Sequence, residues 1–199
     1  MSLPWLEFAI GCISGLNFIR PPPDSSSAMP NREQLVRVIK EHVKKRNDAD
    51  DAEFLFGSER IDLRRVSHLK FEARKGPFKF LVDEPTERGG TNKAPNPLAY
   101  FVAGAASCLL NQYATLAIAR DVRLDDIQLT ARGHFDRRLD GAFEEVIYDI
   151  KLESSASPGS LVALAREAER MCYAHNTLKN AGVKMTTNLY LNGKQIAVT

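Results

Sequence analysis

Cysteine is scarce in this sequence: Cys12, Cys108 and Cys172 are the only three among 199 residues. No two of them form a CxxC pair, and an odd, low number excludes the disulfide framework of a small secreted protein. Free thiols are typical of a reducing compartment, so we predict a cytoplasmic location. Each cysteine is then available for chemistry rather than for cross-linking the fold.

An excess of one charge is also missing. The chain has 27 Lys and Arg against 25 Asp and Glu, a formal net charge of +2. This balance provides no basic field to attract nucleic acid or anionic lipid, so we predict neither nucleic acid nor a membrane surface as a partner. The first basic residue, Arg20, follows the apolar start of the chain, whereas a secretory signal carries its positive charge before the apolar region.

An uninterrupted apolar run long enough to span a membrane is absent too. The most apolar segment, residues 97–119, is broken by Ser107, Asn111, Gln112 and Thr115. We predict that it is the central helix of a soluble domain, with Pro97 in its first turn. Because it is apolar around nearly its whole circumference, we expect it to be buried on all sides. Five small residues immediately before Cys108 would let another element approach closely.

Composition divides the chain into three parts. Residues 1–30 are apolar and then rich in proline and serine, and we predict a poorly packed appendage. A helix docked on the core, or sequence upstream of a start at Met29, are the alternatives. Residues 31–64 contain an amphipathic helix up to Lys45, followed by a link. Residues 65–199 form the main domain.

The main domain alternates strands and helices. Residues 65–83 predict a β-hairpin with its turn at Lys75-Gly76-Pro77, and two more strands follow the central helix. Ser157-Pro158 begins a second helix whose apolar stripe extends to Cys172, and Asn192-Gly193 marks a final hairpin. This order predicts an α+β fold, with both helices packed on antiparallel sheet.

Two cysteines therefore lie on the apolar faces of the two main helices. If these helices pack face to face, one thiolate can attack an oxidant and the other can resolve the sulfenic acid as a disulfide. A nearby cation must favour the thiolate, and Arg74 and His175 are the candidates. Buried core cysteines are the simpler alternative. A metal site of Cys108, Cys172 and His175 is disfavoured, because zinc sites draw two local ligand pairs and only one is present here.

The sequence from about Leu69 to Gly193 resembles the OsmC/Ohr family of osmotically inducible and organic hydroperoxide resistance proteins. Three segments carry the resemblance: FKFLVDEP…GGTNKAPNP, NPLAYFVAGAASCLL and AERMCYAHNTLKNAG. In the second, Cys108 stands eleven residues after Pro97, as the peroxidatic cysteine of the family follows its NP. In the third, Cys172 matches the second cysteine of the family pattern C-P-x-[SH]-x-x-L.

The resemblance implies an intertwined homodimer with active sites at the subunit interface. It also implies reduction of organic hydroperoxides, with Cys108 attacking, Cys172 resolving and an arginine of the first hairpin activating Cys108. Arg74 falls nearest that place, and Arg65 is the alternative. No cofactor is implied, only an external thiol or dithiol reductant.

The sequence departs from the family pattern at two positions. The glutamate that holds the arginine in peroxidases of the family is Leu98 here, and the next residue, Ala99, does not replace it. Glu84 and Glu87 are possible substitutes. The proline after the second cysteine is Tyr173. A catalytically weak dimer that binds a small apolar molecule in its interface pocket is therefore the alternative function.

Overall fold

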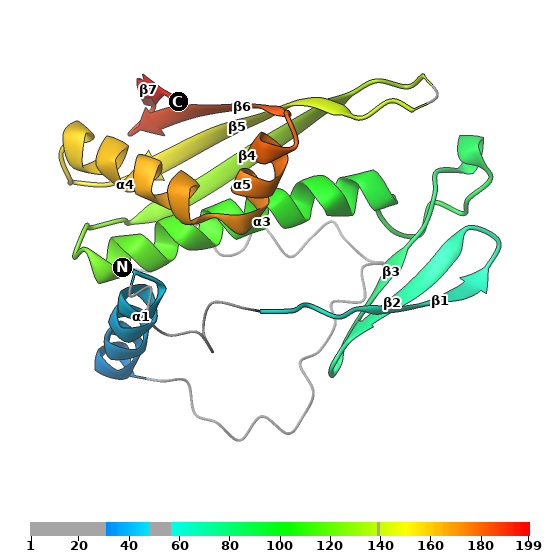
Figure 1. Cartoon of the computed structure of the whole chain (residues 1–199), viewed down its shortest axis with the longest axis horizontal. Helices are drawn as coiled ribbons and strands as arrows, with labels where there is room; N and C mark the ends of the chain where they lie inside the picture. The colour runs from blue at the N-terminus through cyan, green and yellow to red at the C-terminus, as the bar shows by residue number, and fades with distance from the viewer. Residues whose placement is uncertain (1–30, 48–56, 139) are drawn as a thin grey trace, which may run out of the picture.

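The computed structural model describes residues 31–47, 57–138 and 140–199. The elements, in chain order, are α1 (Arg32–Asn47), β1 (Asp62–Ser67), β2 (Lys70–Lys75), β3 (Phe78–Val82), η1 (Thr86–Arg88), α3 (Pro97–Ala119), β4 (Asp126–Phe135), β5 (Phe143–Glu153), α4 (Pro158–Met171), α5 (Tyr173–Asn180), β6 (Lys184–Leu191) and β7 (Lys194–Val198). Strands β1–β3 form one sheet and β4–β7 a second (Figure 1). The predicted α+β class is confirmed.

The four-stranded sheet supports the core of the protein. Strand β5 alternates as its sequence predicts, and Tyr148 and Ile150 are fully buried on its inner face. Strand β5 pairs antiparallel with β4 but parallel with β6. Parallel neighbours need a crossover, which α4 and α5 provide here. The sheet is therefore mixed, and the purely antiparallel arrangement predicted from the sequence is wrong at this one pairing.

Helix α3 lies along the helical side of this sheet (Figure 1). Pro97 occupies its first turn, and the side chain of Asn96 accepts a hydrogen bond from the Ala99 N–H at 2.8 Å, which caps the helix. Leu109, Tyr113 and Leu116 are fully buried. The helix packs against α1, α4, α5 and β4, so it is the core helix that the sequence predicts.

One face of α3 is not covered, however, and the prediction of burial on all sides is wrong for the single chain. We define the uncovered face as the exposed residues along this side of the helix: Leu98, Phe101, Gly104, Ser107 and Asn111. Phe101 is 47% exposed and Leu98 37%. By length and composition alone α3 could cross a membrane, a test that the core helix of a soluble protein also passes.

The first sheet has three strands instead of the two of the predicted hairpin. The segment read as one strand from Arg65 reverses direction at His68, which has a positive φ of 44°. Strands β1 and β2 therefore pair with each other, and β2 pairs with β3 across the predicted turn at Gly76. Apolar side chains on this sheet are exposed, including Leu63 at 61% and Phe78 at 57%.

The loop between β3 and α3 is anchored by Asp83, whose side chain is fully buried. Its carboxylate accepts hydrogen bonds from the Thr91 hydroxyl at 2.5 Å and from the backbone N–H groups of Thr91, Lys93 and Glu84. These donors hold the pKa of Asp83 at about 2, with the Thr91 hydroxyl as the largest cause. Gly90 is needed here, because a Cβ would stand 1.8 Å from the Glu84 carbonyl oxygen. The anchored loop fixes the start of α3.

Helix α1 forms where the sequence predicts an amphipathic helix and packs against α3. Val43 is 3% exposed and belongs to the main core, and the Lys40 ammonium forms an ion pair with Asp121 at 3.0 Å. The predicted appendage of residues 1–30 lies outside the described residues.

Candidate active site at a pair of thiols

Cys108 and Cys172 are in contact. Their Sγ atoms are 3.4 Å apart, and both cysteines are free. A disulfide bond is about 2.05 Å long, so the two sulfurs touch without being bonded. Cys108 is partly exposed, whereas Cys172 is 0% exposed. One residue of the pair is therefore partly accessible to solvent, while its neighbour is not.

The packing of α3 against α4 brings the two thiols together. Ser157 caps α4 by accepting a hydrogen bond from the Ser160 N–H at 3.2 Å, and Pro158 follows in the first turn, as predicted. The apolar stripe of α4, which includes Ala165 and Ala168, is buried against the core. Small side chains on facing helices permit a close approach of their backbones.

Cys172 does not lie within α4 but at its junction with α5. Its N–H donates to the Glu169 carbonyl at 3.2 Å, which ends α4, and its Sγ accepts from the His175 N–H at 3.4 Å, which begins α5. The side chain is thus oriented by two helix ends at once.

Burial keeps the Cys172 thiol protonated. The pKa of Cys172 is raised to about 12: burial is the largest cause, the His175 N–H lowers the pKa, and the Cys108 sulfur adds to the rise. In agreement, the Cys172 thiol donates toward the Cys108 sulfur. Cys172 is therefore a neutral thiol held beside Cys108.

Tyr148 projects from β5 into the same environment. Its pKa is raised to about 12, with burial as the largest cause and the Cys172 and Cys108 thiols as the others. Among the described residues its hydroxyl has no hydrogen-bond partner, and the same holds for Nδ1 of His175. The pKa of His175 is lowered by burial, so this ring is neutral and does not serve as the cation that the sequence suggested.

Arg74 is not brought to the thiols within one chain. It lies on β2, in the three-stranded sheet that stands apart from the α3–α4 contact (Figure 1). Its guanidinium binds Glu72, with Nε at 2.7 Å and Nη2 at 2.6 Å from Oε1. This pairing holds the pKa of Glu72 below its usual value. Arg65, the alternative, belongs to the same sheet.

The suggested substitute glutamates do not hold Arg74 either. Glu84 faces Arg88, with an Oε2–Nη1 distance of 3.6 Å. Glu87 lies in η1, which follows β3 in the sequence, whereas Arg74 lies on β2, which precedes β3. Glu72, which the sequence did not single out, is the carboxylate that binds the Arg74 guanidinium.

A second arginine, Arg46, reaches the neighbourhood of the thiols from the end of α1. Its Nη1 donates to Gln112 Oε1 at 3.1 Å, and its Nη2 donates to the Met171 carbonyl at 2.7 Å. Its Cζ lies 4.5 Å from the centre of the Tyr173 ring. Sequence reasoning missed this residue because a basic run at the end of a helix is ordinarily solvated and complements the helix dipole.

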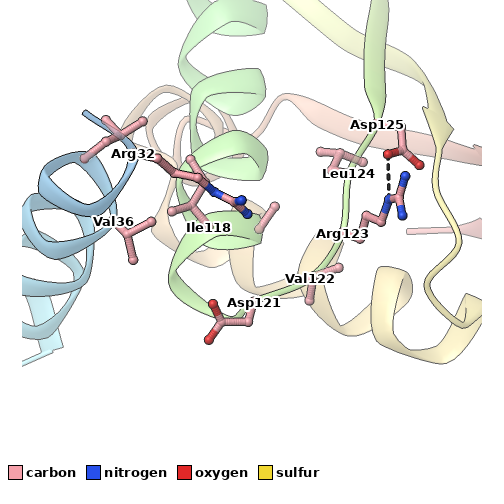
Figure 2. Close-up of a pocket in the computed structure, with 10 residues that line it drawn as sticks. Arg32, Val36, Ile118, Asp121, Val122, Arg123, Leu124 and Asp125 are labelled. Carbon is pink, nitrogen blue, oxygen red and sulfur yellow. Dashed lines mark hydrogen bonds and ion pairs between the residues drawn. The ribbon is translucent and has the colours of Figure 1, made fainter. Parts of the chain in front are cut away.

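Two hollows accompany the helices. A hollow of about 650 Å³ separates the first turns of α1 from the end of α3, and Arg32, Val36 and Ile118 contribute to its wall (Figure 2). It lies away from the thiols. A more apolar groove of about 480 Å³ runs between α3 and β4, beside the residue that precedes Cys108; its lining is Ala99, Val102, Ala103, Ala106, Ser107, Leu110, Leu129 and Ala131.

The described residues offer no metal centre. No group of three or more His, Cys, Asp or Glu side chains among them is placed to hold a metal ion. His175 approaches Cys172 through its backbone N–H rather than through its ring. The arrangement is thus one of thiols, a phenol and apolar side chains, suited to sulfur chemistry.

Comparison with known proteins identifies a family for the part of the chain that carries both thiols. Residues 90–188 match the family model described as OsmC-like protein. No curated protein sequence matches the chain significantly.

Solved structures share the fold. An OsmC-like protein from Mycoplasma pneumoniae is 21% identical, with a TM-score of 0.62 over 68% of this chain and 97% of its own. An organic hydroperoxide resistance protein OsmC from Legionella pneumophila is 20% identical, with a TM-score of 0.56 over 68% and 98%. An organic hydroperoxide resistance protein from Elizabethkingia anophelis is 17% identical, with a TM-score of 0.57 over 69% and 98%.

Proposed function

Because this chain belongs to the OsmC-like family through residues 90–188, we propose that it is a thiol-dependent peroxidase that reduces organic hydroperoxides. The observation that carries the proposal is the 3.4 Å contact between a partly exposed Cys108 and a buried Cys172. Two neighbours of the same fold, from Legionella pneumophila and Elizabethkingia anophelis, are named organic hydroperoxide resistance proteins, which supports the substrate class.

The chemistry needs two thiols and one reductant. The Cys108 thiolate attacks the terminal oxygen of the hydroperoxide, the O–O bond breaks, and the alkoxide takes a proton and leaves as an alcohol. Cys108 is now a sulfenic acid. The Cys172 sulfur attacks it, the S–S bond forms, and the S–O bond breaks with release of water, which carries away the Cys172 proton. An external dithiol then reduces the disulfide and is itself oxidised.

The unequal burial of the thiols suits this division of roles. A peroxide can reach Cys108 but not Cys172, which is 0% exposed. Cys172 in turn is protected from oxidation by its burial and by its raised pKa of about 12. It therefore stays reduced until a sulfenic acid forms next to it.

The apolar groove between α3 and β4 supports a preference for bulky hydroperoxides. All of its lining side chains except Ser107 are hydrocarbon, and its volume of about 480 Å³ suits the organic part of a small peroxide. Burial of apolar surface contributes about 25 cal/mol per Å², a gain that hydrogen peroxide cannot obtain. Cumene hydroperoxide should therefore be reduced faster than hydrogen peroxide.

A second copy of the chain completes the proposed site. The uncovered face of α3 and the exposed apolar side chains of β1–β3 are the surfaces that a second copy would cover. A homodimer that covers them would also bring β2 of one copy toward the thiols of the other, with Arg74 as the activating cation. In this chain Leu98 stands where the family has a glutamate. Glu72 then takes over the function of that glutamate, because Glu72 holds the Arg74 guanidinium.

The test is consumption of cumene hydroperoxide with dithiothreitol as reductant. Cys108→Ser should abolish turnover. Cys172→Ser, treated with one equivalent of peroxide before the reductant is added, should accumulate a dimedone-reactive sulfenic acid where the wild type forms the Cys108–Cys172 disulfide. Cys12→Ser is the matched control and should behave as the wild type. Turnover that survives in Cys108→Ser would refute the proposed role of this residue.

A second function is favoured by the same groove. An OsmC-like dimer without useful peroxidase activity could bind a small apolar molecule there, because the lining offers burial and little else. No turnover by the wild type, together with slow alkylation of both Cys108 and Cys172, would select this function. The cytoplasmic location is common to both proposals and rests on the free thiols.

A further inference from the structure

Arg46 connects the two segments that carry the thiols. On α3 it binds Gln112, which lies one helical turn after Cys108 and on the same side of the helix. At the other end it binds the carbonyl of Met171 and lies over the ring of Tyr173, the two residues on either side of Cys172. One guanidinium therefore bridges α3 and the α4–α5 junction.

Each contact satisfies a group that the fold itself leaves open. Met171 ends α4, and the last carbonyls of a helix have no partner within it, so a cation there is favourable. Gln112 is 8% exposed, and its amide oxygen would otherwise face the core without a donor. Arginine can serve both acceptors at once because its guanidinium presents several donors in a rigid plane.

We propose that Arg46 is a positioning residue for the thiol pair: by joining α3 to the α4–α5 junction, it holds the Cys172 sulfur beside Cys108 and favours formation of their disulfide. Helix α1 thereby takes part in the sulfur chemistry, although it lies before the residues that match the family model. The consequence for peroxide reduction rests on the proposed function. The effect on the thiol pair itself does not.

The decisive measurement is the equilibrium of the thiol pair with glutathione. Two protein thiols and one oxidised glutathione give the protein disulfide and two reduced glutathiones, so the equilibrium constant reports how well the sulfurs are held together. Arg46→Ala should lower this constant severalfold, with about tenfold, the effect of losing one charged hydrogen bond entirely, as the upper limit. Arg46→Lys keeps the charge but cannot bridge both acceptors, so it should lose most of the same effect.

Lys40→Ala is the matched control. Lys40 lies on the same helix and forms an ion pair with Asp121, but it does not contact the thiol segments. The glutathione equilibrium constant of Lys40→Ala should stay within about twofold of the wild-type value, since exposed ion pairs contribute little. Gln112→Met, which removes the other end of the bridge, should shift the constant in the same direction as Arg46→Ala. It provides a second test if Arg46→Ala fails to fold.

Kinetics provide the second readout. After one equivalent of cumene hydroperoxide, Arg46→Ala should form its sulfenic acid at the wild-type rate but close the disulfide more slowly, so that dimedone traps more of it. Equal glutathione constants for wild type, Arg46→Ala and Gln112→Met, with all three folded, would overturn the inference. A wild type that consumes no peroxide would refute the proposed function and leave the glutathione result valid.

Discussion

The buried thiol of Cys172 should resist alkylation far more than an ordinary cysteine. Its pKa is raised to about 12 from an ordinary value of 9.0, with burial as the largest cause. At about pH 8, roughly one part in ten thousand is then thiolate, against about a tenth of an ordinary thiol. Iodoacetamide reacts with the thiolate, so Cys172 should react about a thousandfold more slowly. The side chain is 0% exposed, and this burial slows the reaction with iodoacetamide further.

The assay compares the folded and unfolded protein. The reduced chain is treated with iodoacetamide, quenched at intervals, and the peptides that contain Cys108 and Cys172 are quantified by mass spectrometry. The same reaction in concentrated urea gives the alkylation rate of each cysteine in the unfolded chain. In the folded protein the Cys172 rate should rise about tenfold with each pH unit, because its thiolate fraction rises by that factor.

The variant Cys108→Ser separates the effect of burial on the Cys172 pKa from the effect of the neighbouring Cys108 sulfur. The Cys108 sulfur contributes to the raised pKa of Cys172, but burial contributes more, so Cys172 should remain slow in this variant. Alkylation of Cys172 in the folded wild type at the rate found in urea would refute the reasoning. The rate of Cys108 in the same experiment is informative for function: fast alkylation favours the peroxidase, and slow alkylation the binding protein.

Three further predictions concern stability and assembly. Phe101→Asp should convert a dimer to a monomer in sedimentation, because it places a charge in the uncovered face, whereas Val38→Asp, at a residue on α1 that is 58% exposed, should not. Tyr148→Phe should leave the free energy of unfolding within about 1 kcal/mol of the wild type, because the hydroxyl removed has no partner among the described residues; a denaturant titration that shows a larger loss would reveal one. Asp83→Asn should lower the melting temperature at neutral pH, and since the folded pKa of Asp83 is about 2, its contribution should disappear as the pH falls from about 4 to about 2; identical melting curves at neutral pH would contradict this.

Local patterns in the sequence predict most of the elements because each pattern has a local cause. The helical spacing of α4 places its apolar stripe on one face, and the Ser157-Pro158 pair fixes its start. The Asn192-Gly193 pair predicts the β6–β7 turn, and both residues have the positive φ values that such a turn requires. In each case the signal and the structure involve neighbours in the chain.

The errors in the fold come from pairings that neighbours do not determine. Alternation in the sequence gives the face of a strand but not the direction of its partner, so it did not reveal the parallel pairing of β5 and β6. The helical segment between these strands was the one signal for a parallel crossover. The reversal at His68 was missed because it needs a positive φ at a residue that rarely adopts one. The exposed side of α3 looked like core because composition cannot distinguish a helix that is covered on all sides from one with an uncovered face.

The candidate site was partly predictable for the same reason. Helical periodicity placed Cys108 and Cys172 on apolar faces, but only the packing of α3 on α4 shows their sulfurs at 3.4 Å. Arg46 had no signal at all, since its contacts with Gln112 and Met171 join segments far apart in the sequence. A basic residue at a helix end looks the same whether it is solvated or bridges two helices.

The two proposals assign Arg74 and Arg46 to different steps, and this can be tested directly. Arg74 lies away from the thiols of its own chain, so its proposed effect is on peroxide attack at Cys108 in a dimer. Arg46 contacts the segments around both thiols, so its proposed effect is on disulfide closure. We expect Arg74→Met to slow sulfenic acid formation and leave the glutathione equilibrium unchanged, while Arg46→Ala does the reverse.

The comparison also tests the dimer. Arg74→Met is matched by Arg60→Met, which removes another arginine that is ion-paired to a carboxylate, Asp62 of β1. Suppose that Arg74→Met slows peroxide attack, that Arg60→Met does not, and that Phe101→Asp also slows it. The activating cation then comes from a second copy. If Phe101→Asp makes a monomer that still reduces peroxide at the wild-type rate, Arg74 is not needed at Cys108, and the site is complete within one chain.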